Sequence, residues 1–235
     1  VGGKLEVFPR VAFESLFLKP KEYPRLLLID LTKSGNGTAT GELKASLFSE
    51  WPDHKLMQIH AVNRDTIGLH HHAQSNLIDL SDGIPSDAID SAISAFGPEI
   101  ILYRPTPDTE ALHSVAMDLT KRLGVPLATW IMDDWPTAIA GKSTSKKSAE
   151  KLNSDWKFLL KNASVNFSIC DAMSEAFTER YDVPFVAIAN GIEPSEWPNA
   201  TLKSESKKIV VRYAGSLAEN MTLSSVRLVA EAVQR

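Results

Sequence analysis

Short apolar runs that alternate with longer helical stretches constrain the fold of this chain more than any other feature. The clearest run covers residues 25–31, RLLLIDL, where nearly every side chain is apolar. A strand in a parallel sheet covered by helices has this pattern, because both of its faces are buried. Similar strand candidates occur at residues 55–62, 100–103, 126–132, 165–169 and 184–189.

Stretches that fit helices lie between these runs, at residues 42–51, 85–96, 109–123, 147–160 and 171–181. The last of them opens with Asp171, a favourable N-cap residue. Strands that alternate with helices form βαβ units with right-handed crossovers. We therefore expect an α/β fold built on a Rossmann-like parallel sheet flanked by helices.

The composition excludes several classes of protein. Of the 235 residues, 43% are hydrophobic and 23% are charged, as is usual for a globular domain. No apolar run approaches the roughly 20 residues that a membrane-spanning helix needs. The single cysteine excludes a disulfide framework and a multi-cysteine zinc site. The 25 basic and 29 acidic residues give a net charge of −4, which argues against nucleic acid as a partner.

The composition of the sequence changes after Ala189, and the periodic apolar pattern ends there. Residues 190–208 combine Asn-Gly, two prolines and a Ser/Lys/Glu-rich stretch, a composition typical of a linker. A strand is then expected at 209–215 and a helix at 222–233, a unit too small to bury a core alone. We expect an N-terminal extension (1–24), a Rossmann-like domain (25–193), a linker (194–207) and the start of a second α/β domain (208–235). The first residue, Val, and the helical pattern at the end suggest a piece of a longer protein.

The loop after the first strand is the first candidate site, since ligands of parallel α/β sheets bind beyond the carboxyl ends of the strands. Residues 33–41, KSGNGTATG, follow that strand and precede a helix. Glycines let backbone N–H groups approach an anion, and a helix N-terminus favours negative charge. The candidate phosphate-binding residues are Gly35, Asn36, Gly37 and Thr38. A turn without a ligand is the alternative, because the spacing matches neither the phosphate loop nor the usual dinucleotide fingerprint.

The segment after the fourth strand, residues 130–136 (WIMDDWP), brings carboxylates and aromatic rings together. Carboxylates accept hydrogen bonds from sugar hydroxyls, and flat aromatic faces suit sugar rings. Asp133 and Asp134 are therefore candidate catalytic residues, and Trp135 is a candidate contact for a sugar ring. The alternative is that one of the two aspartates caps a short helix with Pro136 near its first position.

Two later turns are further candidates. Asn190-Gly191 ends the last strand of the first domain, where it forms either part of a cleft or a plain turn. Gly215-Ser216 follows the expected strand of the second unit, as an anion cradle or an ordinary βα turn.

Other residues are expected to be structural. Consecutive side chains point apart, so His70-His71-His72 fits a solvated loop better than a metal site. His60 either faces the ligand edge or packs in the core, with the core favoured. Cys170 is expected to be a structural thiol rather than a nucleophile. A solvated face is the first expectation for a basic patch near the acidic segment, and contact with an anionic acceptor or membrane headgroups is the alternative; its lysines are Lys142, Lys146 and Lys147.

Taken in order, these segments resemble a retaining glycosyltransferase of the GT-B architecture, of the group-1 or family-4 type. Residues 132–136 (MDDWP) resemble the "His-Asp-x-x-Pro" region of that family, with Met132 in place of the His. Residues 162–173 look like its strand, Ser and helix, with Cys170 in place of the Ser. Residues 186–193 (VAIANGIE) are similar to its "Pro-Asn-Gly-Val-Asp" stretch, and 212–217 (RYAGSL) to the start of its donor domain.

The resemblance implies the acceptor-binding domain and the start of the donor domain of an enzyme that moves a sugar from a nucleotide-sugar to a hydroxyl acceptor, with retention. The acceptor would be a glycan or a lipid-linked saccharide, as in polysaccharide biosynthesis. It further implies that Gly35–Thr38, Gly215 and Ser216 approach the donor phosphates, while Trp135, Asn190 and Gly191 line the acceptor cleft. No metal or other cofactor is implied. The resemblance also implies a cytoplasmic location, with peripheral contact at the inner face of the membrane. Without its donor domain, this chain is expected to be inactive.

Two other functions fit the same residues. A nicotinamide-dependent oxidoreductase would use Gly35, Gly37 and Gly41 on the pyrophosphate and Arg64 on a ribose 2′-phosphate. A non-catalytic α/β sugar-binding or interaction module would use the same edge of the sheet without chemistry.

Overall fold

The computed structural model describes residues 22–63, 65–71, 74–79, 86–105, 110–140, 146–190, 211–215, 217 and 222–234. The chain divides into two units, residues 1–191 and 192–235, which are described separately. A strand was expected at 209–215, but residues 211–215, the part of it that the structure describes, have no regular secondary structure. The helix expected at 222–233 is present as α8, Leu223–Gln234.

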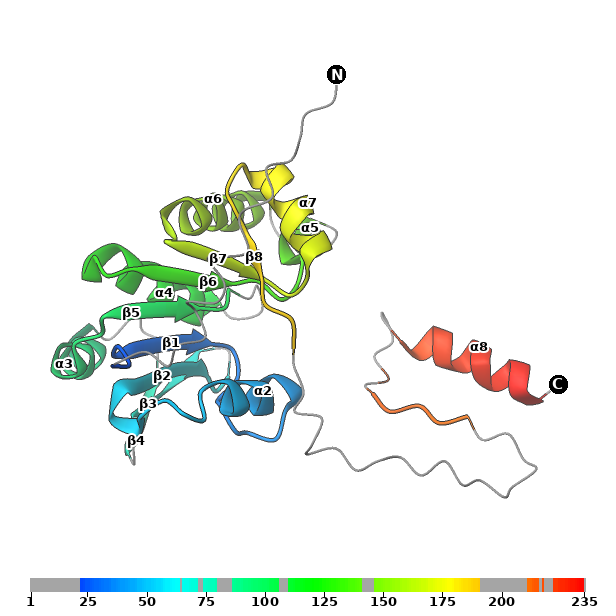
Figure 1. Cartoon of the computed structure of the whole chain (residues 1–235), viewed down its shortest axis with the longest axis horizontal. Coiled ribbons are helices and arrows are strands. Elements are labelled where there is room, and N and C mark those ends of the chain that lie inside the picture. The colour runs from blue at the N-terminus through cyan, green and yellow to red at the C-terminus, as the bar shows by residue number, and fades with distance from the viewer. Residues whose placement is uncertain are drawn as a thin grey trace. The chain divides into compact units, whose positions relative to one another are not determined.

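The first unit is built on an eight-stranded sheet with the order β4-β3-β2-β1-β5-β6-β7-β8 (Figure 1). The pairs on either side of β1 and from β5 to β8 are parallel, and β3 is antiparallel to both β2 and β4. The expected α/β fold is confirmed as a mostly parallel sheet flanked by helices, consistent with a Rossmann-like fold. The strands are β1 (Leu26–Asp30), β2 (Leu56–Ala61), β3 (Thr66–His71), β4 (Gln74–Asp79), β5 (Ile100–Tyr103), β6 (Leu127–Trp130), β7 (Val165–Ser168) and β8 (Val186–Ala187).

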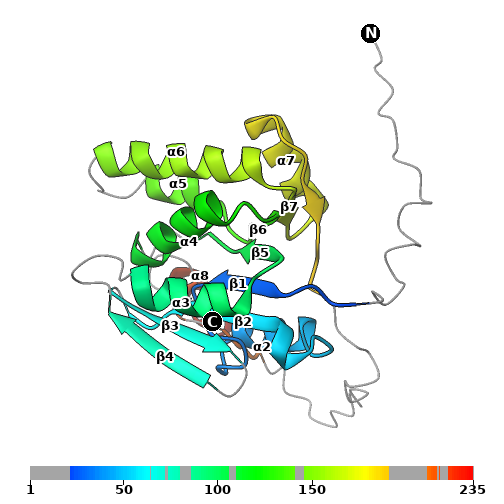
Figure 2. The same ribbon diagram turned by 90° about the vertical axis from the view of Figure 1, so that its left-hand side faces the viewer.

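The helices of this unit follow the predicted order, with one short helix added after β6. They are α2 (Ala39–Leu47), a 3-10 turn η2 (Asp53–Lys55), α3 (Ser86–Phe96), α4 (Glu110–Leu123), α5 (Trp135–Ala140), α6 (Lys146–Asn162) and α7 (Asp171–Tyr181). Figure 2 shows α3, α4 and α6 in one layer along the sheet. The N-cap of α7 is Cys170 rather than Asp171, which lies in the first turn.

Alternation along the strands divides the sheet into two faces. Leu27 and Ile29 belong to the main core, where they meet buried residues of α3, α4 and α6. Leu28 and Asp30 point to the opposite face, where Lys44 of α2 reaches Asp30. A smaller core joins α5, α6 and α7 beside the main one; its buried members are Ile131, Trp135, Trp156, Leu160 and Phe177.

The antiparallel hairpin β3–β4 is the main departure from the expected fold, in which residues 66–79 contained no strand. The expected solvated loop at the histidines is therefore wrong for His70 and His71, which end β3. Only one face of the hairpin is buried in the main core, since Ile67 and Leu69 enter it while Leu77, on the other face, is 69% exposed. Gly68 and the polar residues of β4 weaken the alternating pattern further, which explains why the sequence did not indicate a strand.

Candidate functional site

The carboxyl edge of the parallel strands gathers the predicted loops of the first unit. The chain leaves β1 toward β2 on one side, and β5 lies on the other, so the topological switch point lies between β1 and β5. The glycine-rich loop follows β1, Asp133 follows β6 and Asn190 follows β8. With neighbouring strands about 4.8 Å apart, the β6 loop starts about 10 Å from the glycine-rich loop and the β8 loop about 19 Å from it.

The glycines of the β1–α2 loop have structural reasons to be glycine. Gly35 and Gly37 adopt φ values of 66° and 79°, in the left-handed region that other residues avoid. A β-carbon on Gly41 would lie 2.0 Å from Asn36 Oδ1 and 2.8 Å from the Lys33 carbonyl oxygen. The loop is therefore a defined turn, and its glycines are explained without a ligand.

Backbone N–H groups of this loop donate to the protein itself. The Gly37 N–H donates to Glu42 Oε1 at 2.8 Å, which places a carboxylate inside the expected phosphate cradle. The Thr38 side chain caps α2 by accepting from the Gly41 N–H at 3.1 Å. Further bonds run from Ser34 to Gln58 Oε1, from Gly35 to the Gly41 carbonyl and from Thr38 to Asn36 Oδ1. Ligand contacts from this loop would therefore come mainly from its side chains.

A pocket of about 440 Å³ lies beside this loop, at the carboxyl ends of β1 and β2. The Lys33 ammonium has no hydrogen-bonded partner among the described residues, and neither do the amide NH₂ groups of Asn36 and Asn63. Asn36 and Asn63 use their amide oxygens within the chain. These three side chains bring hydrogen-bond donors to a pocket whose exposed surface is otherwise mostly apolar; its lining consists of Leu31, Thr32, Lys33, Asn36, His60, Ala61, Val62 and Asn63.

His60 lines this pocket and also packs tightly on the sheet. The residue is 7% exposed, and neither ring nitrogen has a partner in the described part of the chain. Burial lowers the pKa of the imidazole below its usual value, and the nearby Lys33 ammonium acts in the same direction. His60 is thus buried, as expected for a packed residue, but it lies on the sheet face opposite the main core and also lines the pocket at the ligand edge.

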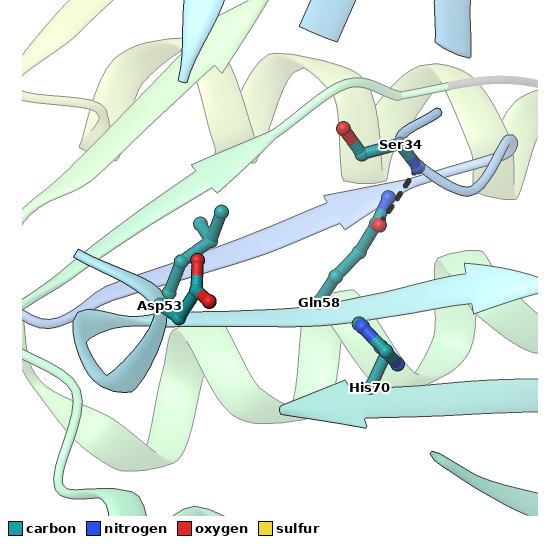
Figure 3. A pocket seen from close by; sticks show the side chains of 5 residues that line it. Ser34, Asp53, Gln58 and His70 are labelled. Carbon is teal, nitrogen blue, oxygen red and sulfur yellow. Dashed lines mark hydrogen bonds between the residues drawn. The ribbon is translucent and has the colours of Figure 1, made fainter. Parts of the chain in front are cut away.

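A second, smaller pocket of about 230 Å³ lies over β2 and β3 (Figure 3). Gln58 points from β2 toward the loop, where its Oε1 accepts from the Ser34 N–H and its Nε2 donates to the Thr32 carbonyl, both at 2.9 Å. His70 borders the same pocket, and burial lowers the pKa of its imidazole. Gln58 therefore fixes the start of the glycine-rich loop to the sheet.

Three charged side chains meet beneath the loop: Asp30, Lys44 and Arg104, which we call the buried charge cluster. Lys44 Nζ lies 3.0 Å from Asp30 Oδ1 and donates to both oxygens of Thr32. Arg104 donates to both carboxylate oxygens of Asp30, from Nε at 2.9 Å and from Nη2 at 2.8 Å. Burial lowers the pKa of Lys44 to about 8, although Asp30 partly offsets it. None of the three was singled out by the sequence, which gives no sign that these charged residues are buried.

The two adjacent aspartates after β6 have different environments. Asp134 caps α5, accepting from the Thr137 N–H and hydroxyl, and it accepts from Arg180 Nη1 at 2.8 and 2.9 Å. Partial burial opposes ionisation, but the bonds from Arg180 and Thr137 outweigh it and lower the pKa of Asp134. Asp133 is exposed and forms no such bond within the described ranges. The predicted capping role thus belongs to Asp134, and the carboxylate that remains available is that of Asp133.

Trp135 packs inside the smaller core rather than beside the carboxyl edge. It is 4% exposed, and its ring lies 4.6 Å from that of Trp156 at an interplanar angle of 72°. Asn190 is exposed, and Gly191 and Ser216 lie outside the described residues, as does Lys142. Gly215 belongs to the second unit, so its place relative to this edge is not described.

Comparison of the chain with protein-family models, with curated proteins and with solved structures finds no match. In the part of the chain that the structure describes, no helix has both the length and the apolar character needed to cross a membrane. The same residues include no group of three or more His, Cys, Asp or Glu side chains placed to hold a metal ion.

Proposed function

We propose that this chain is the acceptor-side part of a retaining glycosyltransferase of the GT-B type, which transfers a sugar from a nucleotide-sugar to a hydroxyl of a glycan or lipid-linked acceptor. The observation that carries the proposal is the pocket of about 440 Å³ at the carboxyl ends of β1 and β2, beside the glycine-rich loop. A pocket of this size suits a sugar-sized ligand, and it lies at the carboxyl edge of the sheet, on the β2 side of β1 and next to the switch point between β1 and β5. The donors that Lys33, Asn36 and Asn63 bring to it suit the hydroxyl and phosphate oxygens of such a ligand.

Within this proposal the carboxylate that orients a hydroxyl is Asp133. Asp134 is bound by Arg180 and Thr137 and keeps α5 in place. It would therefore help to position the site without contacting the substrate. Trp135 supports the same helix from the smaller core. The exposed Asn190, which follows β8, would face the acceptor at the far end of the edge.

The second unit supports a two-domain enzyme. Its helix α8 exposes apolar side chains on one face, with Val229 50% and Val233 61% exposed one turn apart. An amphipathic helix gains stability by burying such a face against a sheet or other helices. A donor-binding domain that includes α8 would supply that contact. The enzyme would act in the cytoplasm, with peripheral contact at the inner face of the membrane.

The test uses the protein encoded by the complete reading frame. Purified protein is incubated with UDP- or GDP-sugars and a lipid-linked or glycan acceptor, and the anomeric configuration of the product is read by NMR. Retention of configuration supports the proposal. In the same preparation D133N is expected to lower kcat at least tenfold. D134N is expected to lower the melting temperature and to lower kcat by a smaller factor than D133N does. Binding of NADPH, with neither binding nor transfer of nucleotide-sugars, would contradict the proposal and favour an oxidoreductase.

A further inference from the structure

The buried charge cluster contains more positive than negative charge. The side chains of Lys44 and Asp30 are fully buried, and that of Arg104 is 7% exposed. Within the described ranges, no second carboxylate pairs with either cation, and Thr32 and Gln58 add only neutral groups. One carboxylate therefore faces two cations. Buried charge without a counter-charge is costly, so an anion that approaches this cluster would be favoured.

Arg104 retains one unused edge for such an anion. Its Nε and Nη2 are bound to Asp30, which leaves both N–H groups of Nη1 and one of Nη2 without partners in the described part of the chain. Nη1 is not among the fully buried polar atoms without a partner, and the Arg104 side chain retains 7% exposure. Two parallel N–H groups on one guanidinium edge match the oxygens of a phosphate.

The position of Arg104 also suits a ligand. It directly follows β5, and its backbone N–H donates to the Ile29 carbonyl of β1 at 2.9 Å. This places Arg104 at the topological switch point between β1 and β5, where α/β sheets bind ligands. Its partner Asp30 also accepts from the N–H of Thr32, which lines the pocket beside the glycine-rich loop. Arg104 does not line that pocket itself and is linked to it through Asp30 and Thr32.

We propose that Arg104 binds a phosphate group of the ligand through its Nη1–Nη2 edge, while Asp30 holds the other edge and Lys44 supplies the excess positive charge. Arg104 makes the direct contact, and Lys44 acts at a distance through its charge. The inference does not depend on the proposed sugar transfer, because any phosphate-bearing ligand at the switch point would use the same edge.

Two matched variants test the inference, since R104M and K44M each leave Asp30 with one cation and a neutral pair. Isothermal titration calorimetry of the full chain with inorganic phosphate is expected to show binding that R104M weakens at least tenfold. K44M is expected to weaken binding by a smaller factor, because it removes charge but keeps the free edge. Equal affinity of wild type and R104M, or no binding of millimolar phosphate by the wild type, would overturn the proposal.

A second measurement needs no variant. Crystals of the wild-type protein soaked in tungstate are expected to show an anomalous peak beside Arg104 Nη1, and peaks only elsewhere would count against the site. Titrations with UDP and with vesicles containing phosphatidic acid distinguish a soluble nucleotide from a lipid as the source of the phosphate. R104M must weaken whichever of them binds. Phosphate binding that depends on Arg104 in a protein that transfers no sugar supports this inference and contradicts the proposed function.

Discussion

The imidazole of His60 lies so close over Gly68 that a β-carbon on Gly68 would come within 2.2 Å of His60 Cε1. The two residues are directly opposite each other in the β2–β3 ladder. Glycine at this position therefore makes room for the buried ring, and the ring in turn fills the space that glycine leaves.

We expect G68A to destabilise the protein by about 1–3 kcal/mol, because the added methyl group overpacks a buried contact. In the H60A background the same substitution should cost much less, since the ring that it meets is gone. Urea unfolding of the wild type, both single variants and the double variant gives the coupling energy. Additive effects of the two substitutions would show that the contact does not exist in solution.

The difference between the adjacent aspartates gives a second prediction. D134A removes the cap of α5 and the partner of Arg180, and we expect it to lower the free energy of unfolding by about 1–2 kcal/mol. D133A, which alters an exposed side chain, should change stability by less than about 0.5 kcal/mol. Chemical denaturation followed by tryptophan fluorescence compares them directly. A larger loss in D133A than in D134A would be inconsistent with the observed contacts.

The buried charge cluster predicts a severe effect of D30N. The substitution leaves Lys44 and Arg104 buried without a counter-charge, and an uncompensated buried charge costs about 3–5 kcal/mol. Adding K44M to D30N should restore part of the lost stability, because one of the two cations is removed. The measurement is the midpoint of guanidinium unfolding for the three proteins. A D30N/K44M protein less stable than D30N alone would refute this account.

The lowered pKa of Lys44 predicts how stability changes at alkaline pH. In the folded protein Lys44 loses its proton near pH 8, whereas in the unfolded chain it keeps the proton up to about pH 10.5. Between these values the unfolded state binds more protons, so Lys44 makes the free energy of unfolding rise with pH. Below pH 8 both states are protonated, and the cost of burying the charge is constant.

K44M is the control that isolates this contribution from the other groups that titrate at high pH. We expect the stability of the wild type relative to K44M to increase from pH 8 to pH 10, with a slope of at most about 1.4 kcal/mol per pH unit. Thermal or urea unfolding at several pH values measures it. A difference that stays constant over this range would show that the Lys44 pKa is not lowered.

The regular elements of the first unit were largely predictable, because burial on both faces leaves a clear mark in a short segment. Strands β1 and β5 and helices α4 and α7 lie within a residue or so of their predicted positions. The hairpin β3–β4 was missed because the face opposite the main core carries Gly68, His70 and Leu77 in place of a regular polar row. The start of α2 was also predicted too late, since Thr38 rather than a later residue caps it.

The candidate site was predictable only in its location. The position of the glycine-rich loop after β1 indicated the carboxyl edge, but not that its N–H groups bind Glu42, Asn36 and Gln58. Likewise, the sequence indicated that one of two aspartates would cap a helix. Asp134 makes the cap through its local bonds from Thr137, whereas its ion pair with Arg180, which lies 46 residues away in the chain, is a tertiary contact.

The sequence alone determined the α/β class, the order of most strands and helices, and the edge of the sheet at which a ligand would bind, because each follows from local patterns of apolar side chains and turns. Only the tertiary structure decided which polar groups are available there. Asp30 and Arg104 are 74 residues apart and meet only because β1 and β5 are neighbours in the sheet. The burial and pairing of charges depend on such long-range neighbours, so they cannot be predicted from the local sequence around each residue.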